Sequence, residues 1–172
     1  RPPLTAAWAQ SSLERSLLAL QTDRIDIFLL HEPRPELLTD SDLPGFLEDS
    51  VRRGTIGQFG VGGDIRHLGA VYRSHPEYCP VVQCGWSVLE AAPPHFPGSQ
   101  LIVFGVLSGL AGRKDLAPAA LRAAALVLPD STILFSSRKS AHVTAGARAL
   151  SDSSLDPAAR QLLANTPRSI LD

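Results

Sequence analysis

A titratable ring ends one of the apolar runs of this sequence. The stretch DRIDIFLLHEP, residues 23–33, passes through Ile25, Ile27 and Leu29 and then places His31 at its last strand-like position. Because side chains two residues apart on a strand point to the same face, His31 would share the face of those three apolar residues. An imidazole there is either a hydrogen-bonded histidine that packs at a strand end or a functional residue of a site. The rest of the sequence distinguishes these interpretations.

The bulk composition is that of an ordinary globular domain and excludes several classes of partner. The chain has 172 residues, of which 44% are hydrophobic and 19% are charged, and its formal net charge is −1. Such a balance argues against binding to nucleic acid or to an anionic membrane surface. No apolar run approaches the length of a membrane-spanning helix. Cys79 and Cys84 lack C-x-x-C spacing, so we expect two reduced thiols, no metal site and a cytoplasmic protein.

The elements that must position His31 alternate between helices and strands. The strand-like runs are almost continuously apolar, as parallel strands buried on both faces are. The stretch 91–100 holds three prolines where a helix is expected, so that helix is absent or reduced to a turn. Periodicity alone leaves a doubly wound sheet and a (β/α) barrel equally open. The predicted strands are 25–31, 55–61, 80–86, 101–106 and 131–137, and the predicted helices are 11–20, 43–53, 64–76, 116–128, 139–150 and 156–165. Ser11 or Ser12 would cap the first of these helices.

Read in order, several segments resemble the aldo-keto reductase family. The run SLERSLLALQTDRIDIFLLHEP is similar to that family's helix followed by a strand ending Leu-Leu-His-x-Pro. LEDSVRRGTIGQFGVGG, VVQCGWSVLE and LIVFGVLSGLAG resemble the strands and loops that follow, and STILFSSRKSAHVTAGARAL resembles the last strand and its helix. No single motif decides the matter, but the order and the gaps agree over essentially the whole chain.

The resemblance implies a partial (β/α)8 TIM barrel of about five βα units, running from the fourth strand to the C-terminus. Residues 1–172 would then form a single incomplete domain, since such a barrel needs eight strands and about 250 residues. The resemblance further implies hydride transfer from NADPH, with NADH as the alternative, to a small carbonyl substrate. In that chemistry a tyrosine protonates the developing alkoxide, a lysine–aspartate pair tunes the tyrosine, and a histidine orients the carbonyl.

Two residues carry over to the nicotinamide end of such a site. His31 matches the catalytic histidine of the family, at the C-terminal end of a strand where barrel sites lie. Gln83 matches the glutamine that holds the nicotinamide carboxamide, because an amide offers both a donor and an acceptor to another amide. The alternative for Gln83 is a core glutamine bonded to neighbouring backbone.

The segment after the fourth predicted strand carries over to the middle of the cofactor. Phe104 stands where the family has a tyrosine that stacks on the nicotinamide ring, and its alternative is a plain core side chain. Gly105, Leu107 and Ser108 fall in the loop that would wrap the pyrophosphate with backbone N–H groups. In this loop Gly105 replaces a serine and Val106 a proline.

The adenosine phosphate would be bound after the last predicted strand. Ser136, Ser137 and Arg138 lie there, ahead of a predicted helix. A pair of hydroxyls, a guanidinium and the free N–H groups of a helix N-terminus suit a phosphate. The same three residues would also serve as an ordinary exposed helix cap.

Departures from the family pattern are equally specific. Gly62 and Gly63 replace a serine–asparagine pair that contacts the carboxamide, and nothing before His31 is a tyrosine or a lysine. Tyr72 and Tyr78 come later and match no catalytic position. We therefore expect the 172 residues to be the C-terminal part of an aldo-keto reductase, without measurable reductase activity alone and prone to associate through open barrel edges.

Two further hypotheses remain beside the oxidoreductase. The first is a degenerate, non-catalytic barrel relative that binds a nucleotide or a protein partner, which the glycine pair and the missing tyrosine favour. The second is an unrelated α/β domain of the flavodoxin type, which the number of strands allows and the order of motifs opposes.

Overall fold

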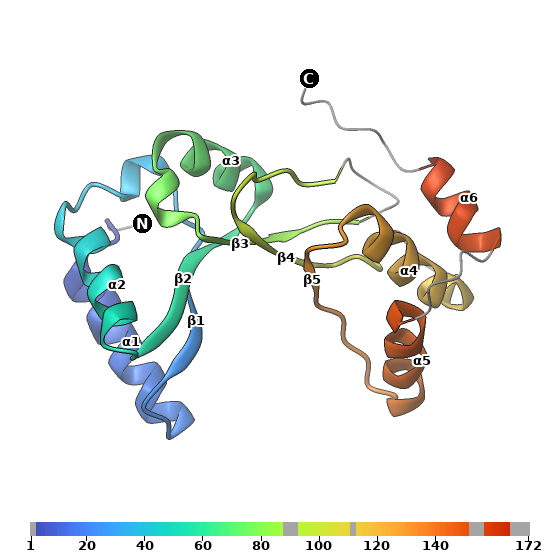
Figure 1. Ribbon diagram of the computed structural model, residues 1–172, viewed down its shortest axis with the longest axis horizontal. Coiled ribbons are helices and arrows are strands. Elements are labelled where there is room, and N and C mark those ends of the chain that lie inside the picture. The colour runs from blue at the N-terminus through green and yellow to red at the C-terminus, as the bar shows by residue number, and fades with distance from the viewer. Residues whose placement is uncertain (1–2, 88–92, 111–112, 152–156, 166–172) are drawn as a thin grey trace. The chain divides into compact units, whose positions relative to one another are not determined.

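The computed structural model describes residues 3–87, 93–110, 113–151 and 157–165, and helices alternate with strands along the chain (Figure 1). Five strands form one sheet in the order β1-β2-β3-β4-β5, and the pairs β1–β2, β2–β3 and β4–β5 are parallel. The strands are β1 (Ile25–His31), β2 (Ile56–Gly63), β3 (Val81–Gly85), β4 (Gln100–Phe104) and β5 (Thr132–Ile133). The helices are α1 (Ala6–Leu20), α2 (Asp42–Arg52), α3 (Ile65–Ser74), α4 (Ala117–Val127), α5 (Ser140–Ser151) and α6 (Pro157–Asn165), with 3₁₀ turns η1 (Pro35–Leu37), η2 (Pro76–Tyr78) and η3 (Lys114–Leu116).

The chain divides into two compact units, which are described separately. The first unit comprises Arg1–Cys84 and Phe96–Gln100, and the second comprises Gly85–His95 and Leu101–Asp172. Every predicted helix and strand is present. Among the described residues, no helix has the length and apolar character needed to cross a membrane. The end of the VVQCGWSVLE motif and residues 91 and 92 lie outside the described residues.

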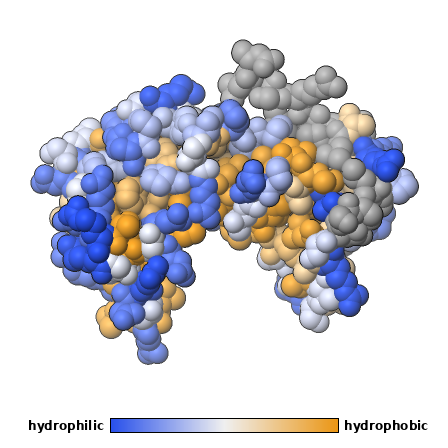
Figure 2. All heavy atoms as spheres, viewed as in Figure 1, coloured by the Kyte–Doolittle hydropathy of each residue, from blue (hydrophilic) through white to orange (hydrophobic). Residues whose placement is uncertain are grey.

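The first unit is built on the long ladder between β1 and β2. Phe28 pairs with Phe59 and Leu30 pairs with Val61, and all four side chains are buried. The intervening residues of β1 are half-buried or exposed, as alternation on a strand requires. In Figure 2, hydrophobic residues come to the surface along these strands, whereas hydrophilic residues cover most of the surrounding helices. One face of β1 is therefore packed and the other, which ends at His31, is open.

The first helix begins earlier than its sequence pattern predicts. Ser11 and Ser12 are the predicted caps, but α1 starts at Ala6, and the Thr5 side chain accepts a hydrogen bond from the Trp8 N–H at 3.1 Å. The Ala6 N–H also donates to Asp40 Oδ2 at 2.8 Å, a bond that holds the start of the helix against the chain before α2. A non-local hydrogen bond thus fixes this terminus.

The predicted interruption between the third and fourth strands is confirmed for residues 93–99, which form no helix. The Tyr72 hydroxyl donates to the Pro97 carbonyl at 2.6 Å, and the Tyr72 ring meets Phe96 edge-on with centroids 5.4 Å apart. The Gln100 N–H donates to the Pro80 carbonyl at 2.9 Å. These side-chain and backbone contacts hold the segment in place where a helix would otherwise do so.

The second unit is packed with smaller side chains. Ala119, Ala120, Ala123 and Ala124 are buried on α4, which contacts both α5 and α6. The last strand pairs with β4 over only two residues, although a strand was predicted over 131–137. The chain after β5 turns its side chains to a pocket beneath α5 instead of continuing the ladder.

Candidate functional site

His31 and Gln83 lie on one row across three neighbouring strands. His31 pairs with Gly62, and Gly62 pairs in turn with Gln83. Neighbouring strands are about 4.8 Å apart, so the backbones of His31 and Gln83 are separated by about 10 Å. The row stands at the C-terminal end of β1, where polar groups of parallel α/β sheets bind ligands. The two residues predicted for the nicotinamide end are thus brought onto the same row by the strand register.

The Gln83 side chain reaches over the empty position of Gly62. A Cβ at Gly62 would lie 3.3 Å from Gln83 Oε1. Gln83 is half-buried, and among the described residues none forms a hydrogen bond with its amide group. A core glutamine would satisfy its donors and acceptor on neighbouring backbone. This amide instead keeps both capacities for a ligand, which is what recognition of another amide requires.

His31 is exposed at the last position of β1. Within the part of the chain that is described, its ring forms no hydrogen bond or ion pair. The next residue, Glu32, has a left-handed backbone with φ of +53°, and its N–H donates to the Gly62 carbonyl at 2.7 Å. The ladder therefore ends one residue beyond the imidazole, in a bent backbone that turns the chain away from the row and leaves the ring accessible.

A second group of candidates surrounds the loop after β4 in the second unit. Phe104 is 43% exposed, and its ring lies 3.3 Å from where a Cβ on Gly85 would be. Gly105 has a φ of +73°, which a residue with a side chain adopts only with strain, and its carbonyl accepts from the Ser108 N–H at 2.8 Å. Phe104, Gly105, Leu107 and Ser108 line a pocket of about 460 Å³ that also reaches Ser136. Phe104 thus has an accessible ring rather than a core position.

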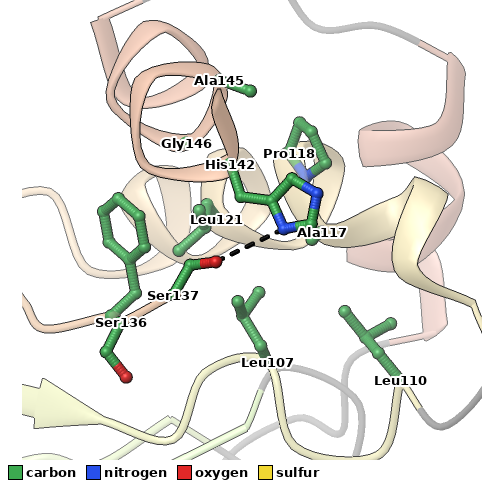
Figure 3. Close-up of a pocket in the computed structure, with 11 residues that line it drawn as sticks. Leu107, Leu110, Ala117, Pro118, Leu121, Ser136, Ser137, His142, Ala145 and Gly146 are labelled. Carbon is green, nitrogen blue, oxygen red and sulfur yellow. Dashed lines mark hydrogen bonds between the residues drawn. The ribbon is translucent and has the colours of Figure 1, made fainter. Parts of the chain in front are cut away.

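A neighbouring pocket of about 390 Å³ lies between this loop and α5 (Figure 3). Its walls are mostly apolar and include Leu107, Leu121 and Phe135, and Ser136 and Ser137 form part of its polar rim. Ser137 Oγ lies 3.3 Å from His142 Nδ1 and accepts the Lys139 N–H at 3.2 Å. The pocket can hold a flat apolar group, with hydroxyl and imidazole groups at its edge for polar atoms.

The sequence reasoning missed His142. The helix 139–150 was predicted, and its N-terminus was placed beside Ser136 and Ser137, but none of its side chains was assigned to the site. His142 shares a helix face with Ala145 and Gly146, which also line the pocket. The i, i+3, i+4 spacing from His142 was the signal that could have found it.

A model of the aldo/keto reductase family matches residues 1–96, more than half of the chain. The chain belongs to the aldo/keto reductase family. A comparison with curated proteins gave no match. Members of this family act on small carbonyl substrates with nicotinamide cofactors.

Solved aldo-keto reductases have the same arrangement of elements. The holo form of aldo-keto reductase AKR11C1 from Bacillus halodurans matches with a TM-score of 0.73 at 18% identity, covering 98% of this chain and 70% of that one. The thermostable aldo-keto reductase Tm1743, in a complex with the inhibitor epalrestat, matches with a TM-score of 0.69 at 21% identity, covering 94% and 67%. MGS-M4, an aldo-keto reductase from a Medee basin deep-sea metagenome library, gives 0.68 at 15% identity, covering 95% and 70%. At these identities the likeness establishes the fold, a partial α/β barrel.

Two kinds of residue that an aldo/keto reductase site would use, a phosphate-binding arginine and a proton-donating tyrosine, do not line the candidate site here. Arg138 is exposed and lines neither of the two pockets described above. The two tyrosines of the sequence are engaged elsewhere: Tyr72 binds the Pro97 carbonyl, and Tyr78 is buried in η2, where burial raises its pKa to about 12. Neither tyrosine is on the row of His31 and Gln83 and neither can protonate a substrate bound there.

Proposed function

We propose that this chain contributes to NADPH-dependent hydride transfer to an aldehyde or ketone. The observation that carries the proposal is the row His31–Gly62–Gln83, which combines an accessible imidazole with an amide that has no partner among the described residues. The residues present fit a nicotinamide group, since the amide of Gln83 stands beside a position without a side chain. When bound, the dinucleotide would supply the hydride.

Each residue of the row has a distinct part in this proposal. Gln83 would donate to and accept from a carboxamide, and so fix the orientation of the ring that carries it. His31 would donate a hydrogen bond to the carbonyl oxygen of the substrate and hold it in line for the transfer. Gly62 would leave the space between them open, because any side chain there would meet Gln83 Oε1.

The second unit would supply contacts for the rest of the dinucleotide. Gly105, Leu107 and Ser108 belong to a tight loop. The Ser108 N–H closes this loop onto the Gly105 carbonyl, so the N–H groups of Gly105 and Leu107 would be the ones offered to a pyrophosphate. The apolar pocket with Ser136, Ser137 and His142 on its rim suits an adenosine. The exposed guanidinium of Arg138, next to Ser137 in sequence, supports NADPH over NADH because a further phosphate would find a cation there.

Neither tyrosine of the sequence lies on the row of His31 and Gln83, so neither would serve as the proton donor of the reaction. We propose that residues 1–172 form part of a single aldo-keto reductase domain whose aspartate, tyrosine and lysine complete the catalytic group. Among the described residues the sheet has five strands, whereas a closed barrel of this kind has eight, and this difference supports the interpretation. The 172 residues alone are then expected to bind cofactor without turning over an aldehyde.

Titration of NADPH fluorescence tests the binding part. Gln83→Ala should weaken NADPH binding by about tenfold, as loss of a hydrogen-bonded ligand contact of about 1.4 kcal/mol does. Gln58→Ala is the matched control, because Gln58 is an exposed glutamine on β2 outside the row. Equal affinity of Gln83→Ala and the wild type would reject the assignment of Gln83, and equal affinity for NADH would reject the role of Arg138.

The alternative function is a non-catalytic relative that binds a nucleotide or a protein. The Gly62–Gly63 pair favours it, since two side-chain contacts to a carboxamide are missing. An assay with a general aldehyde separates the two. A version of the protein that includes the aspartate, tyrosine and lysine should reduce the aldehyde, and NADPH binding without turnover in that version would favour the alternative.

We propose a cytoplasmic location and self-association of this chain, each supported by one observation. The free thiols of Cys79 and Cys84 are buried, and they support a reducing compartment such as the cytoplasm. One side of β1 has no strand partner among the described residues, and Ile25, Ile27 and Leu29 are only half-buried. An open parallel edge of this kind promotes self-association, which light scattering across protein concentrations would detect as a rise in mass.

A further inference from the structure

The backbone directly after His31 is strained. Glu32 has a φ of +53°, and this left-handed conformation is unfavourable for a residue with a side chain. The Glu32 N–H partly compensates by donating to the Gly62 carbonyl at 2.7 Å. Further interactions of Glu32 would be needed to keep the chain in this bend, and its side chain lies in a position to supply them.

The carboxylate of Glu32 occupies a space that Gly63 leaves open. A Cβ at Gly63 would lie 2.9 Å from Glu32 Cδ and 2.9 Å from Glu32 Oε1, closer than such atoms approach one another. Gly63 is the last residue of β2, immediately before the N-cap Asp64 of α3. The glycine therefore allows the carboxylate to lie between the end of β2 and the first turn of the helix.

A histidine of that helix faces the carboxylate. His67 Nδ1 lies 3.8 Å from Glu32 Oε2, and the atom is shielded from solvent and has no hydrogen-bond partner within the described residues. The other carboxylate near His67 is Asp64, which is engaged by the Arg66 guanidinium at 3.0 Å. Glu32 is thus the one group within ion-pairing distance that this shielded nitrogen faces in the described part of the chain.

We propose that Glu32 and His67 form a latch that positions His31. Closure of the pair anchors the left-handed bend to α3, and the bend in turn fixes the direction in which the strand presents the imidazole. In this role Glu32 and His67 are positioning residues, because they act through the backbone next to His31 and need not touch substrate or cofactor. The role of the latch in hydride transfer rests on the function proposed above. The pairing of Glu32 with His67 is independent of that function.

NMR of the histidine rings tests the latch without cofactor, so its outcome is independent of whether NADPH binds. Glu32→Gln and His67→Gln should each move and broaden the ring resonance of His31, and the double variant should change it no further than either single one. The matched control is His75→Gln, which breaks the comparable pair of His75 Nδ1 and Glu77 Oε1 at 3.3 Å and should leave His31 unchanged. A His31 resonance that stays in place in both single variants would overturn the proposal.

A measurement on the unmodified chain covers the case in which a variant does not fold. The backbone amide resonance of Glu32 should follow the protonation of the His67 ring as pH is changed, because the imidazolium strengthens the pair with the carboxylate. A Glu32 amide that shifts only with the titration of its own carboxylate or of His31 would contradict the latch.

Discussion

The two units of the chain differ in how their strands pair and in which side chains fill their cores. The first unit has a long parallel ladder between β1 and β2, and its core contains fully buried Leu30, Leu47 and Val61. The second unit has a two-residue pairing of β4 with β5 and a core rich in alanine. The family model matches residues 1–96, which include nearly all of the first unit, although the solved relatives cover almost the whole chain. The second unit has therefore kept the fold with less of the family's sequence.

The proposed functions of the two units differ in the same way. The first unit offers side chains fixed by strand register, namely the row of His31 and Gln83. The second unit offers a loop, a pocket and a helix terminus, where backbone groups and shape do most of the recognition. Backbone contacts depend less on the identity of the side chains than side-chain contacts do, so the proposed contacts of the second unit place fewer demands on its sequence.

The largest effect is expected where two backbones of the first unit meet. A Cβ at Gly60 would lie 2.0 Å from the Val81 carbonyl oxygen, and this strand cannot move without breaking the ladder. Gly60→Ala should lower the free energy of unfolding by about 3 kcal/mol or more, measured by urea denaturation. Gly45→Ala is the control, because no atom lies within 4 Å of its added Cβ. A Gly60→Ala variant as stable as the control would show that β2 and β3 approach less closely.

The second largest loss of stability is expected from truncating a core side chain of the first unit. Leu30 is fully buried, so Leu30→Ala should cost about 2–5 kcal/mol of unfolding free energy through lost burial and the cavity left behind. Leu134, which is 42% exposed in the second unit, provides the contrast, and Leu134→Ala should change stability by no more than about 0.5 kcal/mol. Similar losses for both variants would contradict the burial of Leu30 in the first unit and the exposure of Leu134 in the second.

A smaller and more local effect is expected from Gly146 in the second unit. A Cβ there would lie 2.6 Å from Phe135 and 2.9 Å from Leu121, side chains that can partly give way. Gly146→Ala should cost about 1–3 kcal/mol and reshape the pocket that both side chains line. Binding of 2′,5′-ADP, followed by calorimetry, should weaken in this variant, whereas undiminished binding would separate the pocket from the adenosine.

The smallest effect concerns the acid end of the stability curve. The Arg66 side chain and its backbone N–H hydrogen-bond Asp64 and lower the pKa of that carboxyl from 3.8 to about 2. A carboxyl with a lowered folded-state pKa stabilises the protein above its unfolded pKa, and this contribution is lost as pH falls from about 4 to about 2. Asp64→Ala should flatten that part of the pH dependence of the thermal midpoint. Identical profiles for the variant and the wild type would contradict the assigned shift.

Much of the fold could be predicted from the sequence because hydrophobic period and strand length are local signals. Strand β1 was predicted with its exact bounds for this reason. The start of α1 could not be predicted, since the bond from the Ala6 N–H to Asp40 selects Thr5 over Ser11 and Ser12 as the cap. The shortness of β5 depends likewise on contacts with α5 that no local pattern contains.

The candidate site could be predicted only in part. His31 and Gln83 carried a family pattern, but their common row depends on strand register, which requires the three-dimensional structure. The helical spacing of His142, Ala145 and Gly146 was a local signal, but its closeness to Ser137 was not. The pairing of Glu32 with His67 could not be predicted, because it joins residues far apart in the sequence. The role of Arg138 stays a prediction, since its side chain is exposed and lines neither pocket.

The most direct test of the central claim uses half of the cofactor. Nicotinamide mononucleotide, titrated into the protein, should shift the side-chain amide resonances of Gln83 and the ring resonance of His31, and it should leave His142 unchanged. The complementary half, 2′,5′-ADP, should shift His142 and leave Gln83 unchanged. A titration in which saturating nicotinamide mononucleotide leaves the Gln83 amide where it was would contradict the assignment of the row as the nicotinamide end of the site.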